Sequence, residues 1–181
     1  VKKEKMDMEK TDDNISINDS YFLFYHMIYE TLQTKNVFDG LDKALDLLRI
    51  YLNSGDIVLH RKDSDETYRS FTSQALMKTS IDTITCIINK ASKLVESKST
   101  LFIDLNLAES LKNIMILHVK TDDNEYILSI NNINTKKTLN ADFQHNLEDT
   151  LNIILKRADI HEKQVIAITE DPLTKLKNRT A

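Results

Sequence analysis

The sequence has few of the residues on which phosphate-binding and disulfide-stabilised folds depend. Its 181 residues include two glycines, one proline, one cysteine and no tryptophan. Gly40 and Gly55 lie far apart, whereas a loop that cradles phosphate needs several glycines close together. Walker and Rossmann sites are therefore excluded. The single cysteine, Cys86, excludes an intrachain disulfide framework and fits a reducing, cytoplasmic location.

Charge and hydropathy exclude two further classes of partner. The chain has 24 basic and 28 acidic residues mixed along its length, for a net charge of −4. We expect no nucleic-acid partner, because such binding usually needs a basic face. No apolar run approaches the roughly 20 residues of a membrane helix, and no signal-peptide pattern is present. Because the chain begins at Val1 and ends within a motif, we expect it to be part of a longer protein.

The hydrophobic pattern predicts an α+β domain behind a flexible N-terminal segment, residues 1–18, which is poor in apolar residues. Helices are expected from Asp19 or Ser20, after Asn36 and from Ser80, and Gly55 is expected to end the second of them. Strands are expected at residues 57–61, 67–71, 100–105, 114–120 and 126–130. The last two strands are apolar on both faces, which predicts a sheet that is covered on both sides.

This order of elements resembles that of GAF domains, which are small-molecule-sensing modules. The resemblance covers about residues 20–170. It is carried by the spacing Phe38-x-x-Leu41-x-x-Ala44-Leu45 and by the segment Asp56-Ile57-Val58-Leu59. It implies a GAF-like antiparallel sheet with helices on both faces. A PAS domain is the nearest alternative, but it usually lacks the paired helices before the first strand.

The resemblance implies a ligand pocket between one face of the sheet and the helices and loops that cross it. Polar groups among strands can orient a ligand in such a pocket, and the candidates are Tyr68, Arg69, Asp104 and His118. The competing interpretation is that these residues face solvent, as most polar strand residues do. No particular ligand is indicated, and no cofactor is expected.

Several ligands of GAF domains are disfavoured. Bilin attachment uses a cysteine commonly followed by histidine, but Cys86 precedes Ile87. Asn89-Lys90 lacks the downstream partners of the cyclic-nucleotide signature. Haem would need a pocket histidine, for which His60 and His118 are the candidates. The five histidines are scattered, and none forms a His-x-x-x-His pair, so no metal site is expected.

A long helix is expected over residues 141–170, and it carries a heptad pattern. Apolar residues recur at alternating steps of four and three with one polar interruption, and the seam comprises Leu147, Leu151, Ile154, Ala158, His161, Val165 and Ile168. At about 1.5 Å per residue the helix would extend roughly 40 Å. We therefore expect a signalling helix that forms a coiled coil in a parallel homodimer.

Three polar residues on this helix bear on that expectation. With Leu151 at position a, Arg157 and Glu162 occupy g and the following e, where they would face each other across a parallel dimer. His161-Glu162 resembles the phospho-accepting site of histidine kinases, but Lys163 and Ile166 replace the apolar residue and the proline of that pattern. His161 is then either a tolerated break in the seam or a layer that titrates near neutrality.

A short motif follows the helix, which should end before Pro172. The spacing Asp171-x-Leu173-Thr174-x-Leu176-x-Asn178-Arg179 resembles the D-x-L-T-G-L-x-N-R signature that opens GGDEF domains, the output domains of diguanylate cyclases, with Lys175 in place of the usual glycine. The resemblance covers only residues 171–181 and implies a truncated start of that domain. The family's catalytic turn and metal-binding aspartate would lie further on, so we expect no catalytic residue and no enzyme activity in this fragment.

These expectations combine into one function. Residues 19–140 would form a GAF-like sensor that passes its ligand or partner state through the helix to a GGDEF domain in the same chain. The alternative is a structural dimerisation module that fills its own pocket and binds no ligand. The third hypothesis, from a different functional class, is an enzyme that acts within this fragment alone.

Overall fold

The computed structural model describes residues 20–62, 64–70, 82, 85–86, 89, 100–103, 114–133, 141–169 and 177. A helix over residues 20–33 comes first. The other elements, in chain order, are α2 (Val37–Leu52), β1 (Ile57–Lys62), β2 (Tyr68–Ser70), β3 (Thr100–Ile103), β4 (Ile114–Lys120), β5 (Glu125–Ile130) and α4 (Ala141–Thr169). Residues 1–18, most of the helix expected from Ser80 and nearly all of the motif after Pro172 lie outside the described part of the chain.

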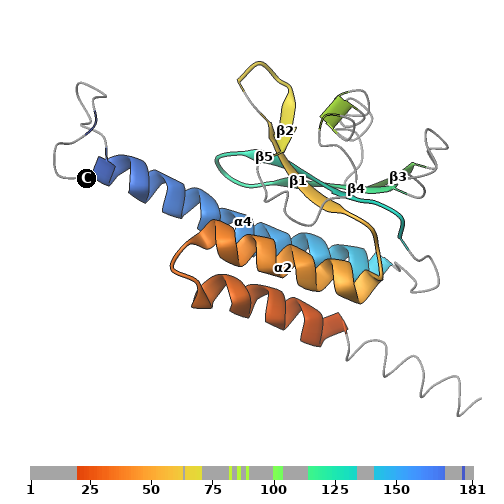
Figure 1. Cartoon of the computed structure of the whole chain (residues 1–181). Coiled ribbons are helices and arrows are strands. Elements are labelled where there is room, and N and C mark those ends of the chain that lie inside the picture. Colours follow the sequence, from red (N-terminus) through yellow and green to blue (C-terminus); the bar gives the residue numbers. More distant parts are fainter. Residues whose placement is uncertain are drawn as a thin grey trace, which may run out of the picture.

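The strands form one antiparallel sheet in the order β2-β1-β5-β4-β3 (Figure 1). The central strand β5 pairs with β1 on one side and with β4 on the other. Both β4 and β5 are buried along almost their whole length. The predicted strands are confirmed, with small shifts at their ends. The burial of β4 and β5 agrees with a sheet that is covered on both sides, whereas helices on both faces remain a prediction, because the long helices of the described residues lie on one face.

The described long helices lie on one side of the sheet. α2 and α4 lie against its lower face in Figure 1, and the helix over residues 20–33 packs against them from the side away from the sheet. The rings of Phe24 and Phe143 lie 5.2 Å apart at the start of α4. Gly40 of α2 permits the close approach of the helix over residues 20–33, because a Cβ atom at position 40 would lie 2.7 Å from the Cα atom of Thr31.

The sequence predicts that the second helix ends at Gly55, but α2 ends earlier. α2 begins after Asn36, whose side chain accepts a hydrogen bond from the backbone N–H of Phe38 at 3.0 Å, as expected of a cap. It ends at Leu52, and Asn53 adopts the left-handed conformation (φ 46°, ψ 46°). Asparagine tolerates this conformation better than most residues do. The helix therefore ends two residues earlier than expected.

The expected seam of α4 is largely inside its own domain. Leu147, Leu151, Ile154 and Ala158 are all 2% exposed or less and pack among the residues between the helices and the sheet. A partner helix therefore has no access to them, and the predicted coiled-coil seam is wrong for this half of α4. The heptad pattern correctly marked the apolar side of the helix, but the sheet of the same chain covers that side.

Candidate functional site

Neighbouring residues of β1 and β5 point to opposite faces of the sheet. Directly paired residues on adjacent antiparallel strands share a face, and the register pairs Arg61 with Tyr126 and His60 with Ile127. Arg61 and Tyr126 point toward α4, where each contacts an acidic side chain. His60 and Ile127 consequently point away from α4. We call the first side the helix face and the second the distal face.

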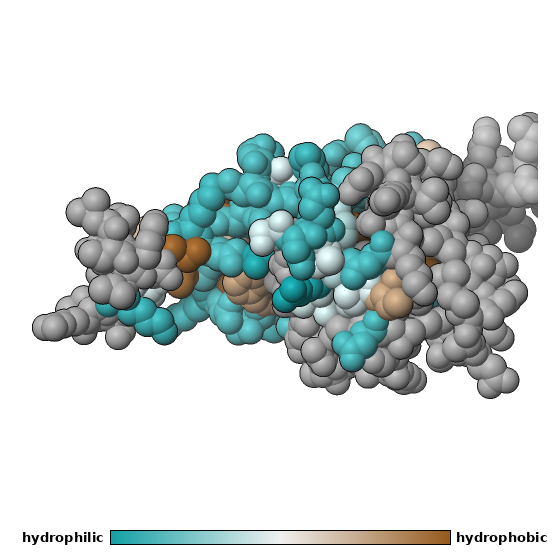
Figure 2. Space-filling model, turned by 90° about the horizontal axis from the view of Figure 1, so that it is seen from above, coloured by the Kyte–Doolittle hydropathy of each residue, from teal (hydrophilic) through white to brown (hydrophobic). Residues whose placement is uncertain are grey.

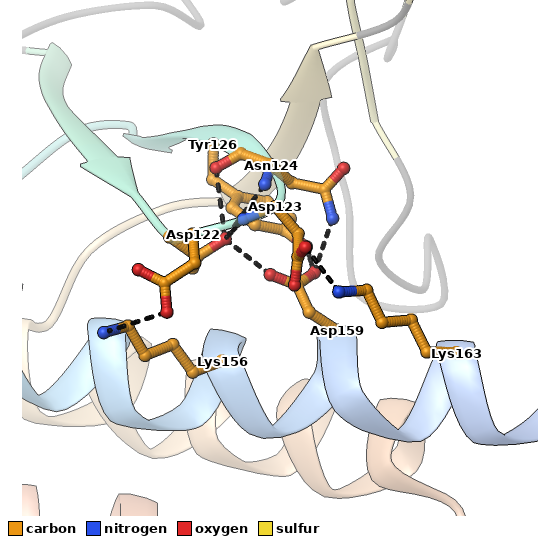
Figure 3. A network of polar contacts seen from close by, with 8 residues as sticks. Asp122, Asp123, Asn124, Tyr126, Lys156, Asp159 and Lys163 are labelled. Atoms are coloured by element: carbon orange, nitrogen blue, oxygen red, sulfur yellow. Dashed lines mark hydrogen bonds and ion pairs between the residues drawn. The ribbon is translucent and has the colours of Figure 1, made fainter.

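On the helix face, a buried carboxylate of α4 holds the β4–β5 turn. Asp159 is 3% exposed and accepts hydrogen bonds from the Thr121 hydroxyl at 2.5 Å, from Asn124 Nδ2 at 2.7 Å and from the Tyr126 hydroxyl (Figure 3). Thr121 also accepts the backbone N–H of Asn124 at 3.1 Å, which fixes the shape of the turn. A buried carboxylate is stable only when its oxygen atoms are well paired, and here they are.

Tyr126 is protonated at every physiological pH. Its burial raises the pKa of the phenol, and the hydrogen bond to the Asp159 carboxylate raises it further. The hydroxyl is therefore a permanent donor to Asp159. This contact joins the first buried residue of β5 to the middle of α4.

Ion pairs at the edge of this network extend the contact along α4. Lys163 Nζ lies 2.5 Å from Asp123, and Lys156 Nζ lies 3.7 Å from Asp122, so the turn is held on both sides of Asp159 (Figure 3). On β1, Arg61 Nη1 lies 2.7 Å from Glu162. About two turns of α4, residues 156–163, are thus attached to the sheet and its β4–β5 turn, which makes movement of the helix and movement of the strands interdependent.

The distal face is mostly apolar, with a few polar groups. In one row across the sheet His60, Ile127 and His118 lie side by side; in the next row Val58, Ser129 and Ile116 do so. These residues are buried except for His118, which is half-buried. A mostly apolar wall with a small number of polar groups is typical of small-molecule sites.

His60 is the most unusual residue of the distal face. Its Nε2 atom lies 3.1 Å from the Ser129 hydroxyl, which itself donates to the carbonyl oxygen of Val58. Because Ser129 donates its hydrogen in that bond, we assign the ring proton to Nε2. Burial lowers the pKa of His60 to about 4, so the ring is neutral. Its Nδ1 atom is then an acceptor, and it has no hydrogen-bond partner among the described residues.

Asn131 is a second buried residue whose polar side-chain atoms lack a hydrogen-bond partner among the described residues. It follows Ile130, which faces the helices, so the alternation of β5 places its side chain on the distal face. Its backbone continues the pairing with the segment before β1 through bonds to Asp56 and Gly55 of 2.9 and 2.8 Å. The side chain is 1% exposed, and neither Oδ1 nor Nδ2 has a partner among the described residues.

The predicted pocket residues meet different outcomes. Tyr68 is fully buried at the distal face, beside Lys62 of β1, and His118 lies in the row of His60. Arg69 is exposed and lies 3.5 Å from Asp65, so it points to solvent and is wrong as a pocket residue. Asp104 lies outside the described residues.

Two residues of the distal face, Ser129 and Asn131, were not predicted from the sequence. The sequence does contain a pattern that could have indicated them, because Ser129 and Asn131 alternate with the apolar residues Leu128 and Ile130. The sequence indicates His60 only as a candidate haem ligand.

A charged hollow near the end of the sheet is a weaker candidate. It is lined in part by Lys62, Ser64, Lys120 and Glu125. Glu125 lies 2.8 Å from Lys120 and 3.1 Å from Lys62, and the hydrogen bond from Lys120 is the main reason why the pKa of Glu125 is lowered. The charges of the hollow are thus engaged with one another.

The polar residues expected at the dimer interface contact their own chain. Arg157 donates a hydrogen bond to the carbonyl oxygen of Thr31, and Glu162 pairs with Arg61. The prediction that Arg157 and Glu162 face each other across a dimer is therefore corrected: it assumed an interface that the domain core occupies. His161 is half-buried, whereas Val165 and Ile168 are exposed on the last turns of α4.

The motif residues Asp171, Leu173, Thr174, Leu176, Asn178 and Arg179 lie outside the described residues. Within the described part of the chain, three or more metal-binding side chains nowhere come together. In the same part, no helix combines the length and the apolar character needed to cross a membrane.

Comparison with known proteins gives the fold. Neither the protein-family models nor the curated proteins contain a match to the sequence. Among solved structures, the GAF domain of an Acinetobacter phosphoenolpyruvate-protein phosphotransferase matches at a TM-score of 0.60 and 14% identity, over 82% of this chain and 96% of that one. The phycoerythrobilin-bound GAF domain of a cyanobacterial phytochrome matches at 0.54 and 10%, over 79% and 97%.

A third structure, fRMsr of Staphylococcus aureus in complex with substrate, matches at a TM-score of 0.51 and 12% identity, over 76% of this chain and 94% of that one. Identities this low establish a common fold and no common ligand or activity. GAF domains are sensor and regulatory modules. The chain has the GAF fold.

Proposed function

We propose that this chain is the sensor and dimerisation region of a GGDEF-type diguanylate cyclase, in which α4 carries the state of the sensor to the output domain. One observation carries the proposal: α4 is anchored to the sheet through Asp159 and continues toward the motif that begins at Asp171. The GAF fold supports the sensor part. The resemblance of residues 171–181 to the GGDEF signature supports the output part.

The strands β1 and β5 supply a physical route between the two parts. His60 and Ser129 face the distal side, while the neighbouring Arg61 and the nearby Tyr126 hold α4. A ligand on the distal face that favours one position of these strands would also favour one position of α4. The shift is limited by the difference between its affinities for the two states.

The last turns of α4 are suited to transmit such a shift. They project beyond the sheet (Figure 1), and hydrophobic side chains lie on their surface (Figure 2), among them Val165, Ile166 and Ile168. In a GGDEF protein two output domains must meet around GTP. The relative position of two such helix ends would control that meeting.

A second copy of the chain is the proposed partner, in a parallel homodimer. Because the first half of the heptad seam is buried, pairing falls to exposed hydrophobic side chains beside it, namely Tyr21, Phe22, Tyr25, Tyr29 and Leu32 of the first helix and Ile153 and Ile160 of α4. The contact of Arg157 with Thr31 holds these two helices next to each other. Large exposed apolar surfaces of this kind mark interaction sites.

Sedimentation tests the dimer. The wild-type chain should be a dimer, and the double variant Tyr25→Lys/Ile160→Lys should be a monomer with an unchanged circular dichroism spectrum. The matched control is Ile50→Lys, which changes an isoleucine of α2 that is 60% exposed and lies outside the proposed surface. A wild-type monomer at high concentration, or equal dissociation of the control, would contradict the proposed interface.

Insertions after Thr169 test transmission in the full-length protein, with cyclic di-GMP formation from GTP as the readout. Seven added residues nearly restore the heptad phase of a paired helix, whereas four rotate its two ends relative to each other. We expect the seven-residue insertion to retain regulation and the four-residue insertion to disturb it. Absence of cyclic di-GMP from the wild-type protein, or equal regulation in both variants, would contradict the proposal.

The alternative function is a dimerisation module without a ligand. It is favoured by the complete burial of Val58, Ile116 and Ile127, which leaves the distal face closed to solvent at these positions. The two functions predict the same oligomeric state. They differ in whether the polar groups of the distal face have a binding partner outside the chain.

A further inference from the structure

The distal face holds two buried side chains whose hydrogen-bonding capacity is unused among the described residues. They are His60, 0% exposed, with Nδ1 as an acceptor, and Asn131, 1% exposed, with both amide atoms. Buried polar groups are almost always paired, because leaving one unpaired costs free energy comparable to a lost hydrogen bond. Three such atoms on one face of one sheet call for an explanation.

Ser129 provides the contrast. It lies on the same face between the other two, and its hydroxyl has partners on both sides, His60 and Val58. The fold is therefore able to satisfy a buried polar side chain at this place. That it does so for Ser129 and not for Asn131 indicates that the two residues have different roles.

We propose that the distal face binds a mainly apolar ring compound without a negative charge, whose amide-type edge pairs with Asn131 and whose hydroxyl or N–H group donates to His60. The inference deepens the proposed sensor function, on which it rests, by naming the class of ligand. Asn131 offers one donor and one acceptor side by side, which an amide edge matches. His60 offers only an acceptor.

The surroundings of the two side chains set the size and charge of this ligand. The register places His60 opposite Ile127, four residues from Asn131 on β5, so their Cα atoms lie roughly 14 Å apart. The wall near them consists of Val58, Ile114, Ile116 and Ile127, which are all buried. An apolar ring system fits such a wall.

A negative charge on the ligand is disfavoured by the charged residues near Asn131. Asp56 lies next to Asn131 in the pairing of the backbone and is itself buried, which disfavours an anion. The lysines of the distal face, Lys62 and Lys120, lie at the other end of the strands and pair with Glu125. An anionic ligand near Asn131 would therefore meet a carboxylate and no nearby cation among the described residues.

The first test measures the thermal midpoint of the ligand-free chain. If His60 and Asn131 are kept for a ligand, replacing them with apolar residues of similar size should raise the midpoint, as happens when a binding site is given up for stability. His60→Phe and Asn131→Leu are the two variants. Ser129→Ala is the matched control, which should lower the midpoint because it leaves His60 Nε2 without its acceptor.

The second test uses two fluorescent probes of one shape. Hydroxynaphthamide carries a hydroxyl and a carboxamide at opposite ends of a naphthalene, and hydroxynaphthoate has a carboxylate in place of the carboxamide. The amide should bind the wild-type chain and raise its midpoint, and the carboxylate should bind at least about tenfold more weakly, because a buried charge needs a partner. Asn131→Leu and His60→Phe should each weaken binding of the amide by about tenfold or more.

Each outcome of these two tests either supports or overturns the inferred ligand class. Higher midpoints of the two variants together with binding of the amide support the inference. Lower midpoints would show that both side chains stabilise the fold, and failure of the amide to bind, or equal binding of the carboxylate, would overturn the ligand class. These results are separable from the insertion experiment: transmission can persist when the probe fails, and the probe can bind when both insertions leave regulation unchanged.

Discussion

The two faces of the sheet differ in how completely their buried polar groups are hydrogen-bonded. On the helix face, the Asp159 carboxylate accepts three hydrogen bonds from the β4–β5 segment. On the distal face, His60 Nδ1 and the amide of Asn131 have no partner among the described residues. We call the contact of Asp159 with Thr121, Asn124 and Tyr126 the junction. The chain satisfies the hydrogen bonds of the junction by itself, whereas it leaves polar atoms of the distal face without a partner among the described residues.

The same two strands serve both faces. β5 contributes Tyr126 to the junction and Ser129 to the distal face; β1 contributes Arg61 to the junction and His60 to the distal face. Because successive side chains of a strand alternate, one strand connects a rigid contact with α4 to a place where free energy can still be gained by binding. This arrangement suits a sensor that must report to a helix.

The largest expected effect is that of Asp159→Ala. The substitution leaves Thr121, Asn124 and Tyr126 without their acceptor, and the first and last of these are buried. We expect a loss of about 3–5 kcal/mol in the free energy of unfolding, typical of breaking a buried charged network. Tyr126→Phe removes one of the three bonds and should cost about 1–2 kcal/mol. Urea unfolding followed by circular dichroism measures both.

Asp149→Ala is the matched control, because Asp149 lies on the exposed side of the same helix and its side chain is 65% exposed. Its effect should stay within about 0.5 kcal/mol. If Asp159→Ala cost no more than this control, the junction would not hold α4, and the contrast between the two faces would disappear.

The second expected effect is a pH dependence that originates on the distal face. Burial lowers the pKa of His60 to about 4 from an unfolded value of 6.5. Between these values the unfolded chain binds a proton that the folded chain excludes, so stability falls as the pH falls from 6.5 toward 4. The total contribution is about 3 kcal/mol. Urea unfolding at intervals of pH measures it.

His60→Phe should remove this part of the pH dependence. The matched control is His145→Gln on α4, where the histidine side chain is 74% exposed, and it should leave the profile unchanged. A His60→Phe profile that still falls between pH 6.5 and 4.5 as the wild-type profile does would show that His60 is not the group responsible.

Much of the fold was predictable, because each element depends on local pattern. The short apolar runs at residues 114–120 and 126–130 predict β4 and β5 almost to the residue, and the period of α4 predicts its extent. The partner of α4 was not predictable in this way. Periodicity shows that Leu147, Leu151 and Ile154 share an apolar side, but not whether a sheet or a second helix covers it.

The polar sites were harder to predict for the same reason. Tyr126 and Asp159 are 33 residues apart in sequence, and nothing in either segment announces their hydrogen bond. His118 lies within a predicted strand and is therefore a candidate pocket residue, whereas Asn131 lies just past the predicted strand 126–130, although both face the distal side. The sequence marks polar residues among apolar ones, and only the register decides which of them meet.

The smallest expected effect concerns the ion pair of Arg61 and Glu162, which sharpens the contrast by testing the rim of the junction. Both side chains are about one-third exposed, so solvent screens the pair and we expect a coupling of about 0.5–1 kcal/mol. A double-mutant cycle with Arg61→Gln and Glu162→Gln measures it, and the pair Lys43–Glu30, 3.8 Å apart and more exposed, serves as control. The coupling should fall in 1 M salt, where screening extends over only about 3 Å. A coupling above about 2 kcal/mol that is insensitive to salt would place this pair with the buried network around Asp159 and would move the boundary of the junction outward to β1.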